Sequence, residues 1–482
     1  MKQKKNHLRG AGKMSKIKVR FSNEKIVTPG GLSVIGMLIE KSGISGLLNK
    51  LPMFKKHKKT DENKEYNPDI VNSDVVSAYI GLLSQGKIEY EAVNEYKDDA
   101  ESYCEMLGLT AIPSPETLRQ RLDIIGNTMQ SIVKESNIEL LKVADVKMGT
   151  RLHDYVPLDV DVSPFDNSNS KKEGVSWTYK KHDGYSPIFA NIGEEGYLLN
   201  LELRPGSQHS QNGTPEFLEE TIRYGKELTS QKLLLRMDAG FDSADNIRLC
   251  MKEETRVHFI IKRNLRQEDI EMKSKRAKDM AERAKSDKSI ESYVTSPREG
   301  KTIWIGSVYK NVDGIEERPI RIVYEVIERT ITKAGQIMLA PETEVSEWWT
   351  DLDQTGEKGV TAKEIIEEYH DHATSEQFHS ELKTDMDVER LPSKYFATNA
   401  GIMVLVMFAY NCLKIMGQES LNEDDSPLKR PVKRRRIKTV MKNLITYAVR
   451  VVKTGRQILL NLGCSNAWRY TFRRVFAAVA EY

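Results

Sequence analysis

Residues 154–163, DYVPLDVDVS, decide the fold of this chain. Alternate side chains of a β-strand point to opposite faces, so the apolar residues of this stretch would fill a core while Asp159 and Asp161 share the other face. Two further strands are predicted at 185–193, YSPIFANIG, and at 196–206, GYLLNLELRPG, with a tight turn between them. Together the three segments predict strands joined through hairpins.

Helix and strand alternate after this hairpin. Helices are predicted over 214–228 and 243–254, and strands over 232–238 and 257–263. Hairpin-linked strands followed by such alternation predict an α/β fold, in which a mixed sheet has helices on its faces. By analogy, this order is the one found in ribonuclease H-like folds.

The alternation stops after Arg266, where a polar stretch leads into three predicted strands. These are KTIWIGSVYKNVDG (301–314), RPIRIVYEVIERT (318–330) and GQIMLAP (335–341). We interpret residues 267–345 as a β-rich insertion, because the chain returns to the core pattern afterwards. A free-standing domain is the alternative.

The chain is therefore divided into five predicted regions. They are a helical, DNA-binding region (1–150), the first part of a ribonuclease H-like catalytic core (151–266), the β-rich insertion (267–345), the second part of the core (346–416) and a basic helical C-terminal region (417–482). The helical patterns of the first region suit a generic bundle equally well. The apolar run 401–410 is about half as long as a bilayer requires, so it predicts a buried core helix and no membrane association.

Positive charge is concentrated towards both ends of a chain whose net charge is only +3. Residues 1–20 carry eight Lys and Arg and no acid, and residues 429–474 carry fourteen, again without an acid. Basic ends on a near-neutral protein indicate a polyanionic partner, with solvated tails as the alternative. The four cysteines lie far apart, which favours a reducing cytosol, and no secretory signal is predicted.

Two acidic residues are placed at the ends of predicted strands, where α/β sheets bind ligands. Asp238 ends the strand LLLRMD, and the nearby Ser243 is the better cap for the helix that follows. Asp161 lies nearer to its strand end than Asp159, so we prefer Asp161 as the second acid. The alternation of side chains cannot choose between the two, because both lie on the same face.

The segment YHDHATSEQFHSELK (369–383) supplies a third acid. At about 100° per residue, Tyr369, His372, Glu376 and Lys383 fall on one helix face. Such a face is either solvated or part of a metal and phosphate site, because a buried ionised carboxylate needs a cation nearby. Two strand acids and one helix acid supply the oxygen ligands that two Mg²⁺ ions require in phosphodiester chemistry. A zinc hydrolase is disfavoured, because no HExxH motif is present.

The same segments resemble the bacterial insertion-sequence transposases with a DDE domain. The resemblance is carried by LDVDVSPFDNSNSKKEGVSWTYKKHDGYSPIFANIG, ELRPGSQHSQNG, LLLRMDAGFDSADN, FIIKRNLR and YHDHATSEQFHSELKTDMDVERLP. It implies that Asp161, Asp238 and Glu376 are the catalytic triad and bind two Mg²⁺ ions, for which Mn²⁺ could substitute.

The resemblance also implies a signature of Tyr, Arg, Glu and Lys along the last helix. This chain matches the signature at Tyr369, Glu376 and Lys383. His372 stands where the signature has Arg, and His offers a phosphate one donor and a positive charge only when protonated.

The resemblance implies further contacts with DNA. The β-rich insertion holds DNA ends in the family, and a Trp stacks on a flipped base in some relatives. The candidates for that Trp are Trp304, Trp348 and Trp349, for each of which a core position is the alternative. Phosphate contacts are predicted for seven basic residues, which are Lys262, Arg263, Arg266, Lys433, Arg434, Arg435 and Arg436.

The predicted function is that of a cut-and-paste DNA transposase. Its expected partner is double-stranded DNA, both the element ends and the target, bound by a homodimer. The expected location is the bacterial cytoplasm, at the nucleoid. Two alternatives are a ribonuclease H-like nuclease that does not join ends and a catalytically inactive DNA-binding regulator.

Overall fold

Five strands form the centre of the structure, in the order β7-β6-β2-β8-β9. They are β2 (Val156–Val162), β6 (Ile188–Ile192), β7 (Tyr197–Glu202), β8 (Leu233–Met237) and β9 (His258–Lys262). β2 runs antiparallel to β6 and parallel to β8, and β8 runs parallel to β9, so the sheet is mixed. This computed structural model describes residues 19–21, 23–51, 69–332, 334–354, 359–372, 375–455 and 457–482, apart from the side chains of residues 316 and 317.

Two helices connect the strands of the central sheet. α7 (Thr214–Leu228) joins β7 to β8, and α8 (Ala244–Met251) joins β8 to β9. Ser243 caps α8 by accepting a 3.2 Å hydrogen bond from the Asn246 amide, which was the cap predicted from the sequence. The predicted α/β class, a mixed sheet flanked by helices, is confirmed.

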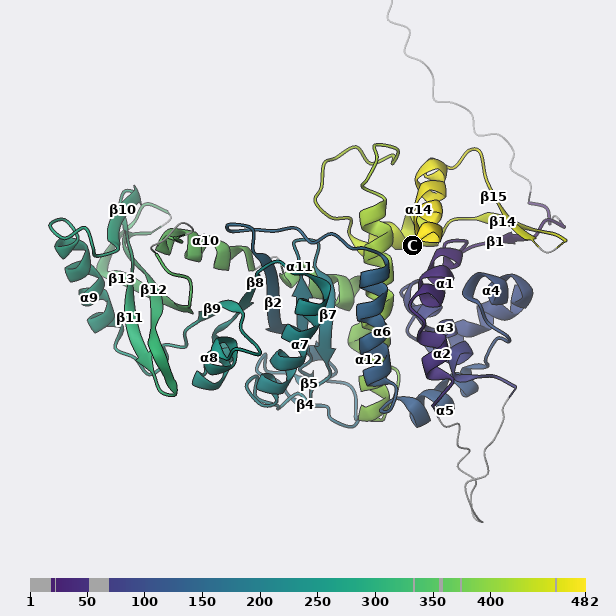
Figure 1. The fold of residues 1–482 in the computed structure, drawn as a ribbon, viewed down its shortest axis with the longest axis horizontal. Helices are drawn as coiled ribbons and strands as arrows, with labels where there is room; N and C mark the ends of the chain where they lie inside the picture. Colours follow the sequence, from purple (N-terminus) through teal and green to yellow (C-terminus); the bar gives the residue numbers. More distant parts are fainter. Residues whose placement is uncertain are drawn as a thin grey trace, which may run out of the picture.

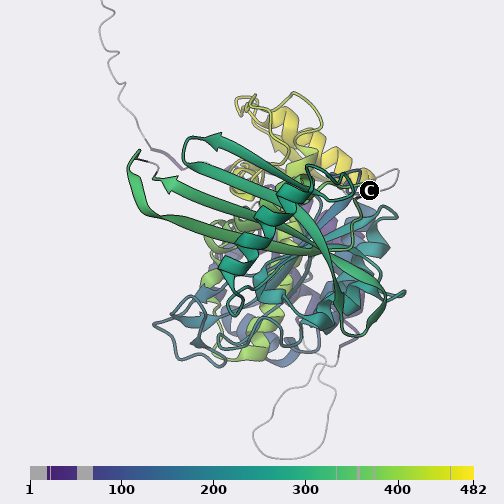
Figure 2. The same cartoon turned by 90° about the vertical axis from the view of Figure 1, so that its left-hand side faces the viewer.

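The insertion extends the central sheet (Figures 1 and 2). Its strands, with a helix α9 (Ile270–Arg283) lying across them, are β10 (Ser292–Arg298), β11 (Lys301–Val312), β12 (Ile315–Ile331) and β13 (Ile337–Thr350). β13 pairs antiparallel with β9, so the nine strands form one sheet and the insertion is not free-standing. The predicted boundary at residue 345 falls inside β13, because this long strand runs from the insertion into the core.

Three short strands that the sequence analysis missed lie between β2 and β6 in the chain. β3 (Phe165–Asp166), β4 (Ser176–Trp177) and β5 (Asp183–Tyr185) form a separate small sheet in the order β3-β5-β4. Strands of two or three residues are too short to show a period of two. The small sheet begins three residues after the carboxyl end of β2 and is connected mainly by loops.

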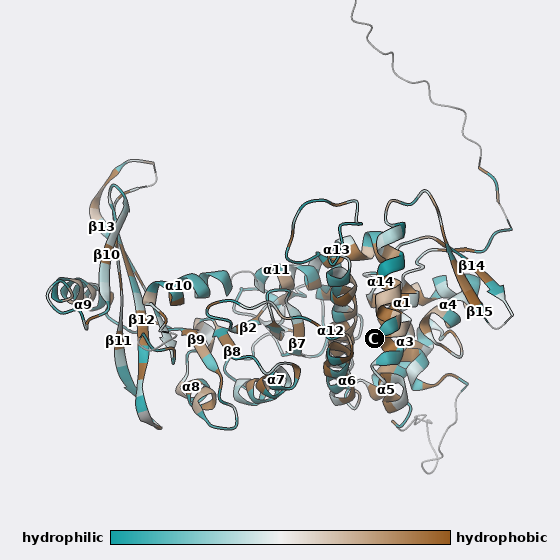
Figure 3. Ribbon diagram, turned by 45° about the horizontal axis from the view of Figure 1, so that its top comes forward, coloured by the Kyte–Doolittle hydropathy of each residue, from teal (hydrophilic) through white to brown (hydrophobic). Residues whose placement is uncertain are grey.

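A helical body packs beside the sheet (Figure 1). Its helices are α1 (Leu32–Lys41), α2 (Ile44–Leu48), α3 (Asn72–Leu83), α4 (Ala100–Leu107), α5 (Pro115–Ile125), α6 (Gln130–Val143) and the 3₁₀-helix Tyr90–Asp99. α12 (Phe396–Glu419) lies between this body and the sheet, where it contacts α3, α6 and β7. α12 is long and apolar enough to cross a membrane, but its apolar stretch is entirely buried in the protein. Figure 3 shows hydrophobic colouring on α12 and mostly hydrophilic colouring on α9 and α10.

The C-terminal region contains strands as well as helices. Its elements are α13 (Ile437–Val440), a π-helix (Met441–Ile445), β14 (Val449–Thr454), β15 (Gln457–Leu462) and α14 (Arg469–Glu481). β14 also pairs with β1 (Ile26–Val27), which ties the two ends of the described chain together. The predicted helical tail therefore includes a hairpin, and its predicted start at residue 417 falls inside α12.

The segment predicted as one helix over 369–383 is divided. α10 (Ala362–Asp371) begins with a capping box made by Thr361 and Glu364. α11 (Ser375–Ser380) follows, and it continues into a π-helix (Glu381–Asp385) and a 3₁₀-helix (Val388–Arg390). The apolar period of a sequence does not distinguish α from π turns, so the shared face predicted for the four signature residues needed correction.

Candidate active site

Asp161 and Asp238 come together at one edge of the sheet. β2 and β8 are parallel, and Val160 of β2 is paired with Met237 of β8. Asp161 and Asp238 are the next residues along the two strands, and each lies at the carboxyl end of its strand. Ligands of α/β sheets bind at such ends. The structure thus brings together the two strand acids that the sequence singled out.

The two carboxylates disfavour each other's charge. Burial and the neighbouring Asp238 raise the pKa of Asp161 to about 6. Burial also raises the pKa of Asp238, although the Gly240 amide donates a 2.9 Å hydrogen bond to its Oδ1. Perturbed acids in a pair are typical of functional sites. This pair is suited to receive a positive charge.

Asp159 has a structural role instead. Its side chain is 4% exposed and accepts hydrogen bonds from Arg236 Nε at 2.6 Å, Arg236 Nη2 at 2.8 Å and His372 Nδ1 at 2.9 Å. Burial alone would raise the pKa of Asp159, but Arg236 and His372 outweigh burial and hold it well below the usual range. The two aspartates between which the sequence left a choice therefore differ in their partners: Asp159 is bonded to Arg236 and His372, and Asp161 lies beside Asp238.

Arg236 links the strands to α10. Its Nη1 donates to the Glu368 carbonyl at 3.0 Å and to Glu368 Oε1 at 2.6 Å. Arg151 reaches the same carboxylate from the other side, with its Nε 3.2 Å from Glu368 Oε2. The buried ions of this region thus neutralise one another across β2, β8 and α10.

The signature residues surround the acid pair in different ways. His372 is buried against Asp159; burial lowers the pKa of His372, but the Asp159 carboxylate outweighs burial and raises it. Lys383 donates a 2.6 Å hydrogen bond to the Pro164 carbonyl just beyond β2. Burial first, then Asp238 and Asp161, raise the pKa of Tyr369. All three side chains thus lie near the acid pair, and His372 also joins the ion network through Asp159.

Glu376 is exposed, and no hydrogen bond or ion pair joins its carboxylate to Asp161 or Asp238, whereas its neighbour His379 approaches the site. Nδ1 of His379 lies 3.7 Å from Asp161 Oδ2, and burial lowers the pKa of this imidazole to about 3. Residues three apart on a helix are neighbours, so Glu376 lies on the α11 surface next to His379. Among the described residues, no three His, Cys, Asp or Glu side chains gather as a metal site.

The donor set nevertheless fits divalent cations. Asp161 and Asp238 offer hard carboxylate oxygens, as Mg²⁺ prefers, and because the pKa of each is raised, a nearby cation would favour their ionised forms. Each keeps one carboxylate oxygen free of hydrogen bonds to described residues, since Val162 and Gly240 occupy only the two Oδ1 atoms. Glu376 is the third ligand that α11 could bring to this pair.

A loop of the small sheet borders the acids, and the sequence analysis did not select it. Tyr179 is 64% exposed, yet its hydroxyl donates a 3.0 Å hydrogen bond to the Val162 carbonyl at the end of β2. Trp177 is 61% exposed, and the exposed Lys180 lowers the pKa of Asp161. The interleaved aromatic and basic residues of WTYKK were the available signal.

The predicted DNA contacts after β9 divide into two kinds. Lys262 is half-buried and acts on the Asp238 carboxyl, whose pKa it lowers, and Arg266 is exposed. Arg263 is instead buried, ion-paired with Glu347 and with Glu268. The guanidinium is thus held by one buried and one partly exposed acid, so a DNA contact of Arg263 would compete with these ion pairs.

The tryptophans suggested for base stacking are largely core residues. Trp348 and Trp349 are buried, and the Arg263 guanidinium lies 4.7 Å from the Trp349 ring centroid. Trp304 is half-buried, with Lys278 Nζ 5.0 Å from its ring centroid. The structure therefore assigns the two buried tryptophans to packing.

The mixed α/β sheet carries two acids at adjacent strand ends, where such sheets bind ligands. The family model of the transposase DDE domain group 1 matches residues 9–482, and the chain belongs to this family. The predicted resemblance to DDE transposases is thereby confirmed.

Solved structures similar to this chain include a transposase complex. The chain is similar to a piggyBac transposase in a synaptic complex with hairpin DNA, with a TM-score of 0.37 and 12% identity over 86% of this chain and 79% of that chain. A search of curated proteins finds no match.

Proposed function

We propose that the protein is a cut-and-paste DNA transposase of an insertion sequence, active on element ends and target DNA. The observation that carries the proposal is the pairing of Asp161 and Asp238 at adjacent strand ends, with the pKa of both carboxyls raised. Membership in the transposase DDE domain family supports it. A purely structural acid pair would be expected to have cationic partners, as Asp159 has.

Asp161, Asp238 and Glu376 would hold two divalent cations, Mg²⁺ or Mn²⁺. When bound, such ions activate the attacking oxygen and stabilise the leaving oxygen of a phosphodiester. The chain's own contribution is to place acids on rigid strands and to surround them with cations. Lys180, Lys262 and Lys383 lie near enough to influence one of the acids, so they can offset the charge of a bound phosphate.

In the proposed reaction, water first cleaves a phosphodiester at the element end and releases a 3′ hydroxyl. That hydroxyl then attacks a target phosphodiester at the same site, and the displaced oxygen leaves as the new strand end. Two ends must be joined to one target, so the DNA-bound form is proposed to be a homodimer. The setting proposed is the bacterial nucleoid.

The test uses a duplex that carries the sequence flanking the coding region, labelled at the element end, together with supercoiled plasmid. Mg²⁺-dependent cleavage followed by covalent joining of the label to plasmid is the expected result. Cleavage without joining would indicate a nuclease, and salt-sensitive binding without any product would indicate a regulator.

A further inference from the structure

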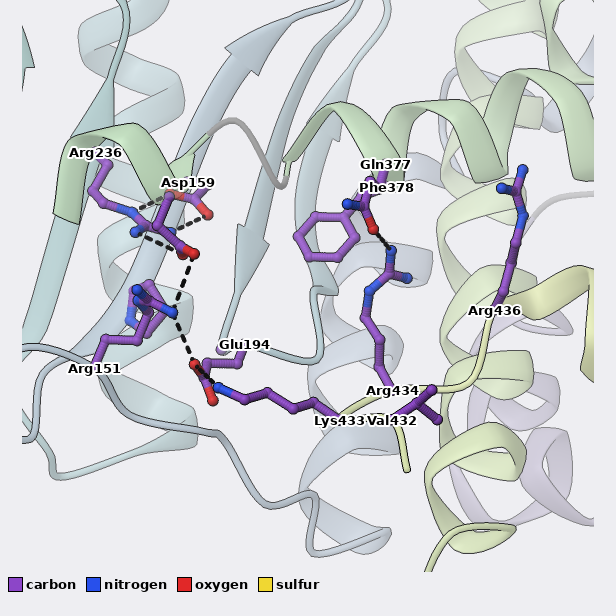
Figure 4. A pocket seen from close by; sticks show the side chains of 13 residues that line it. Arg151, Asp159, Glu194, Arg236, Gln377, Phe378, Val432, Lys433, Arg434 and Arg436 are labelled. Atoms are coloured by element: carbon purple, nitrogen blue, oxygen red, sulfur yellow. Dashed lines mark hydrogen bonds and ion pairs between the residues drawn. The ribbon is translucent and has the colours of Figure 1, made fainter. Parts of the chain in front are cut away.

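The basic cluster of the C-terminal region lies against the catalytic core. Residues 432–436 are here called the basic strap, and all of them except Arg435 form one side of a cavity of about 530 Å³ (Figure 4). Arg151, Asp159 and Glu194 line the cavity from the core, and Gln377 and Phe378 line it from α11. The strap therefore bridges the C-terminal region and the helix that carries Glu376.

Each cation of the strap has a partner in the protein, although Lys433 and Arg436 remain largely exposed. Lys433 Nζ lies 2.8 Å from Glu194 Oε1, and Arg435 Nε donates to Ser420 Oγ at 3.0 Å. Arg436 Nε donates to Asp385 Oδ2 at 2.7 Å. Arg434 is ion-paired with Glu381, and its second amino group donates to Gln377 Oε1 at 2.8 Å. A run predicted to meet phosphates is thus largely occupied by the protein itself.

Arg434 makes three contacts with the segment that presents Glu376. It bonds to Gln377, the next residue after Glu376, and its guanidinium lies 4.7 Å from the Phe378 ring centroid. Its third contact is Glu381, the first residue of the π-helix that carries Lys383. One side chain therefore contacts the middle of α11 and the residue that follows its last turn.

This contact is electrostatically strong. The Glu381 side chain is 1% exposed and faces Arg434, which is 14% exposed. Removing one member of a buried ion pair leaves an uncompensated charge, which is far more costly than breaking a surface pair. The Tyr410 hydroxyl also donates a 3.3 Å hydrogen bond to Glu381.

The segment 375–385, which Arg434 contacts, contains only short helices, so its own backbone hydrogen bonds do little to fix its position. α11 spans six residues and continues into a five-residue π-helix. Short helices are marginal without tertiary contacts, and π turns are rare and often found at functional sites. The orientation of Glu376 towards the acid pair therefore depends on what packs against this segment.

We propose that Arg434 is a positioning residue, which acts through Glu381 and Gln377 to set the orientation of α11 and so the approach of Glu376 to Asp161 and Asp238. The inference rests on the proposed function, because it takes Glu376 as a metal ligand. It differs from the predicted DNA-binding role, in which Arg434 would contribute phosphate affinity like any other cation of the cluster.

The test compares Arg434→Gln with wild type by three measurements. Amide hydrogen exchange over residues 375–385 and Mn²⁺ affinity are measured on the DNA-free protein, and cleavage is measured at saturating DNA. Faster exchange over this segment, Mn²⁺ binding weakened about 10- to 100-fold and a similar fall in kcat are expected, as for other residues that orient metal ligands. The DNA dissociation constant and its salt dependence should stay unchanged.

Two further variants keep the result interpretable. Arg223→Gln removes a cation from exposed ion pairs with Glu135 and Glu227 and should change none of the three readouts. Gln377→Leu removes only one exposed acceptor of Arg434, so it should fold normally and shift exchange and Mn²⁺ affinity in the same direction, by less.

The outcomes separate the inference from the proposed function. Unchanged exchange and Mn²⁺ affinity in Arg434→Gln would overturn the inference. Loss of DNA affinity with a shallower salt dependence would overturn it in favour of a phosphate contact. Absence of cleavage by the wild-type protein would count against the proposed function, while the exchange and metal readouts would still decide the role of Arg434.

Discussion

Two aspartates on strand β2 show opposite electrostatic behaviour although they are two residues apart on one face. Asp159 is enclosed by Arg236 and His372, which hold its pKa well below the usual range. Asp161 lies beside Asp238, and burial with this second carboxyl raises its pKa to about 6. Asp159 is 4% exposed and Asp161 is 23% exposed, so the more buried carboxyl has the lower pKa and the difference lies in their partners.

The comparison teaches that the middle of β2 carries an acid with cationic partners, whereas its carboxyl end carries an acid that faces a second carboxyl. The network around Arg236 ties β2 and β8 to α10, so it serves the fold. The Asp161 and Asp238 pair opposes its own ionisation, which is a cost to stability that a bound cation would remove. Violations of good local energetics concentrate at functional sites.

The largest expected effect is on catalysis. Asp161→Asn or Asp238→Asn should lower strand cleavage by at least about a thousandfold and leave end binding detectable, because each removes an anionic metal ligand. Cleavage of a labelled end and gel-shift binding measure the two effects. Metal-dependent cleavage at the wild-type rate would remove that residue from the site.

Asp159→Asn is the matched control on the same strand. In EDTA at pH 7, Asp161→Asn should raise the melting temperature, because a repelled charge disappears. Asp159→Asn should lower it, because Arg236 loses its carboxylate partner. Melting-temperature shifts of the same sign in both variants would contradict the opposite electrostatic environments inferred for Asp159 and Asp161.

The next effect is on stability. Arg236→Met should lower the free energy of unfolding by about 3–5 kcal/mol, because Asp159 and Glu368 would stay buried without their shared cation. Urea denaturation measures the loss. Arg223→Met, which breaks exposed pairs, should cost at most about 1 kcal/mol, and equal costs for the two variants would be inconsistent with a buried network.

The sequence was informative where the physics is local. The strand period and the position of Asp238 before a glycine turn predicted the central sheet and the two strand-end acids. The Ser243 cap followed from the same kind of short-range argument. Such features depend on residues within a few positions of one another.

Partners distant in the chain could not be predicted. His372 meets Asp159 across 213 positions, and Arg434 meets Glu381 across 53. A basic run looks the same in sequence whether it is solvated, bound to DNA or paired with acids of the fold. The division of the signature segment into α and π turns also left no mark in its apolar pattern.

A smaller effect is expected at His372, where relatives of the resembled family have Arg. His372 is buried between Asp159 and Arg236, so the larger guanidinium of His372→Arg would crowd the network and add a second cation beside Arg236. Stability should fall by about 1–3 kcal/mol in chemical denaturation. His370→Arg, at an exposed position of α10, is the control and should be neutral. Unchanged stability with raised cleavage would make residue 372 a phosphate contact after all.

The smallest effect is expected at a buried charge that lacks a hydrogen-bonding partner. Lys414 is buried with no hydrogen bond from Nζ to the described residues, and burial lowers its pKa to about 8. The unfolded chain, with a lysine pKa of about 10.4, binds more protons between these values, so wild-type stability should rise as the pH rises from 8 to 10.4. Lys414→Met should therefore stabilise the protein by about 1 kcal/mol below pH 8, since lost contacts with the Phe378 and Tyr410 rings offset part of the gain. The gain should shrink above pH 8 in denaturation curves, whereas the exposed Lys442→Met should show no such pH dependence. A gain in stability that is constant from pH 7 to 10.4 would mean that packing, and not the charge of Lys414, sets the effect. The conclusion drawn from Asp159 and Asp161, that the partners of a buried charge decide its cost, would then not apply to Lys414.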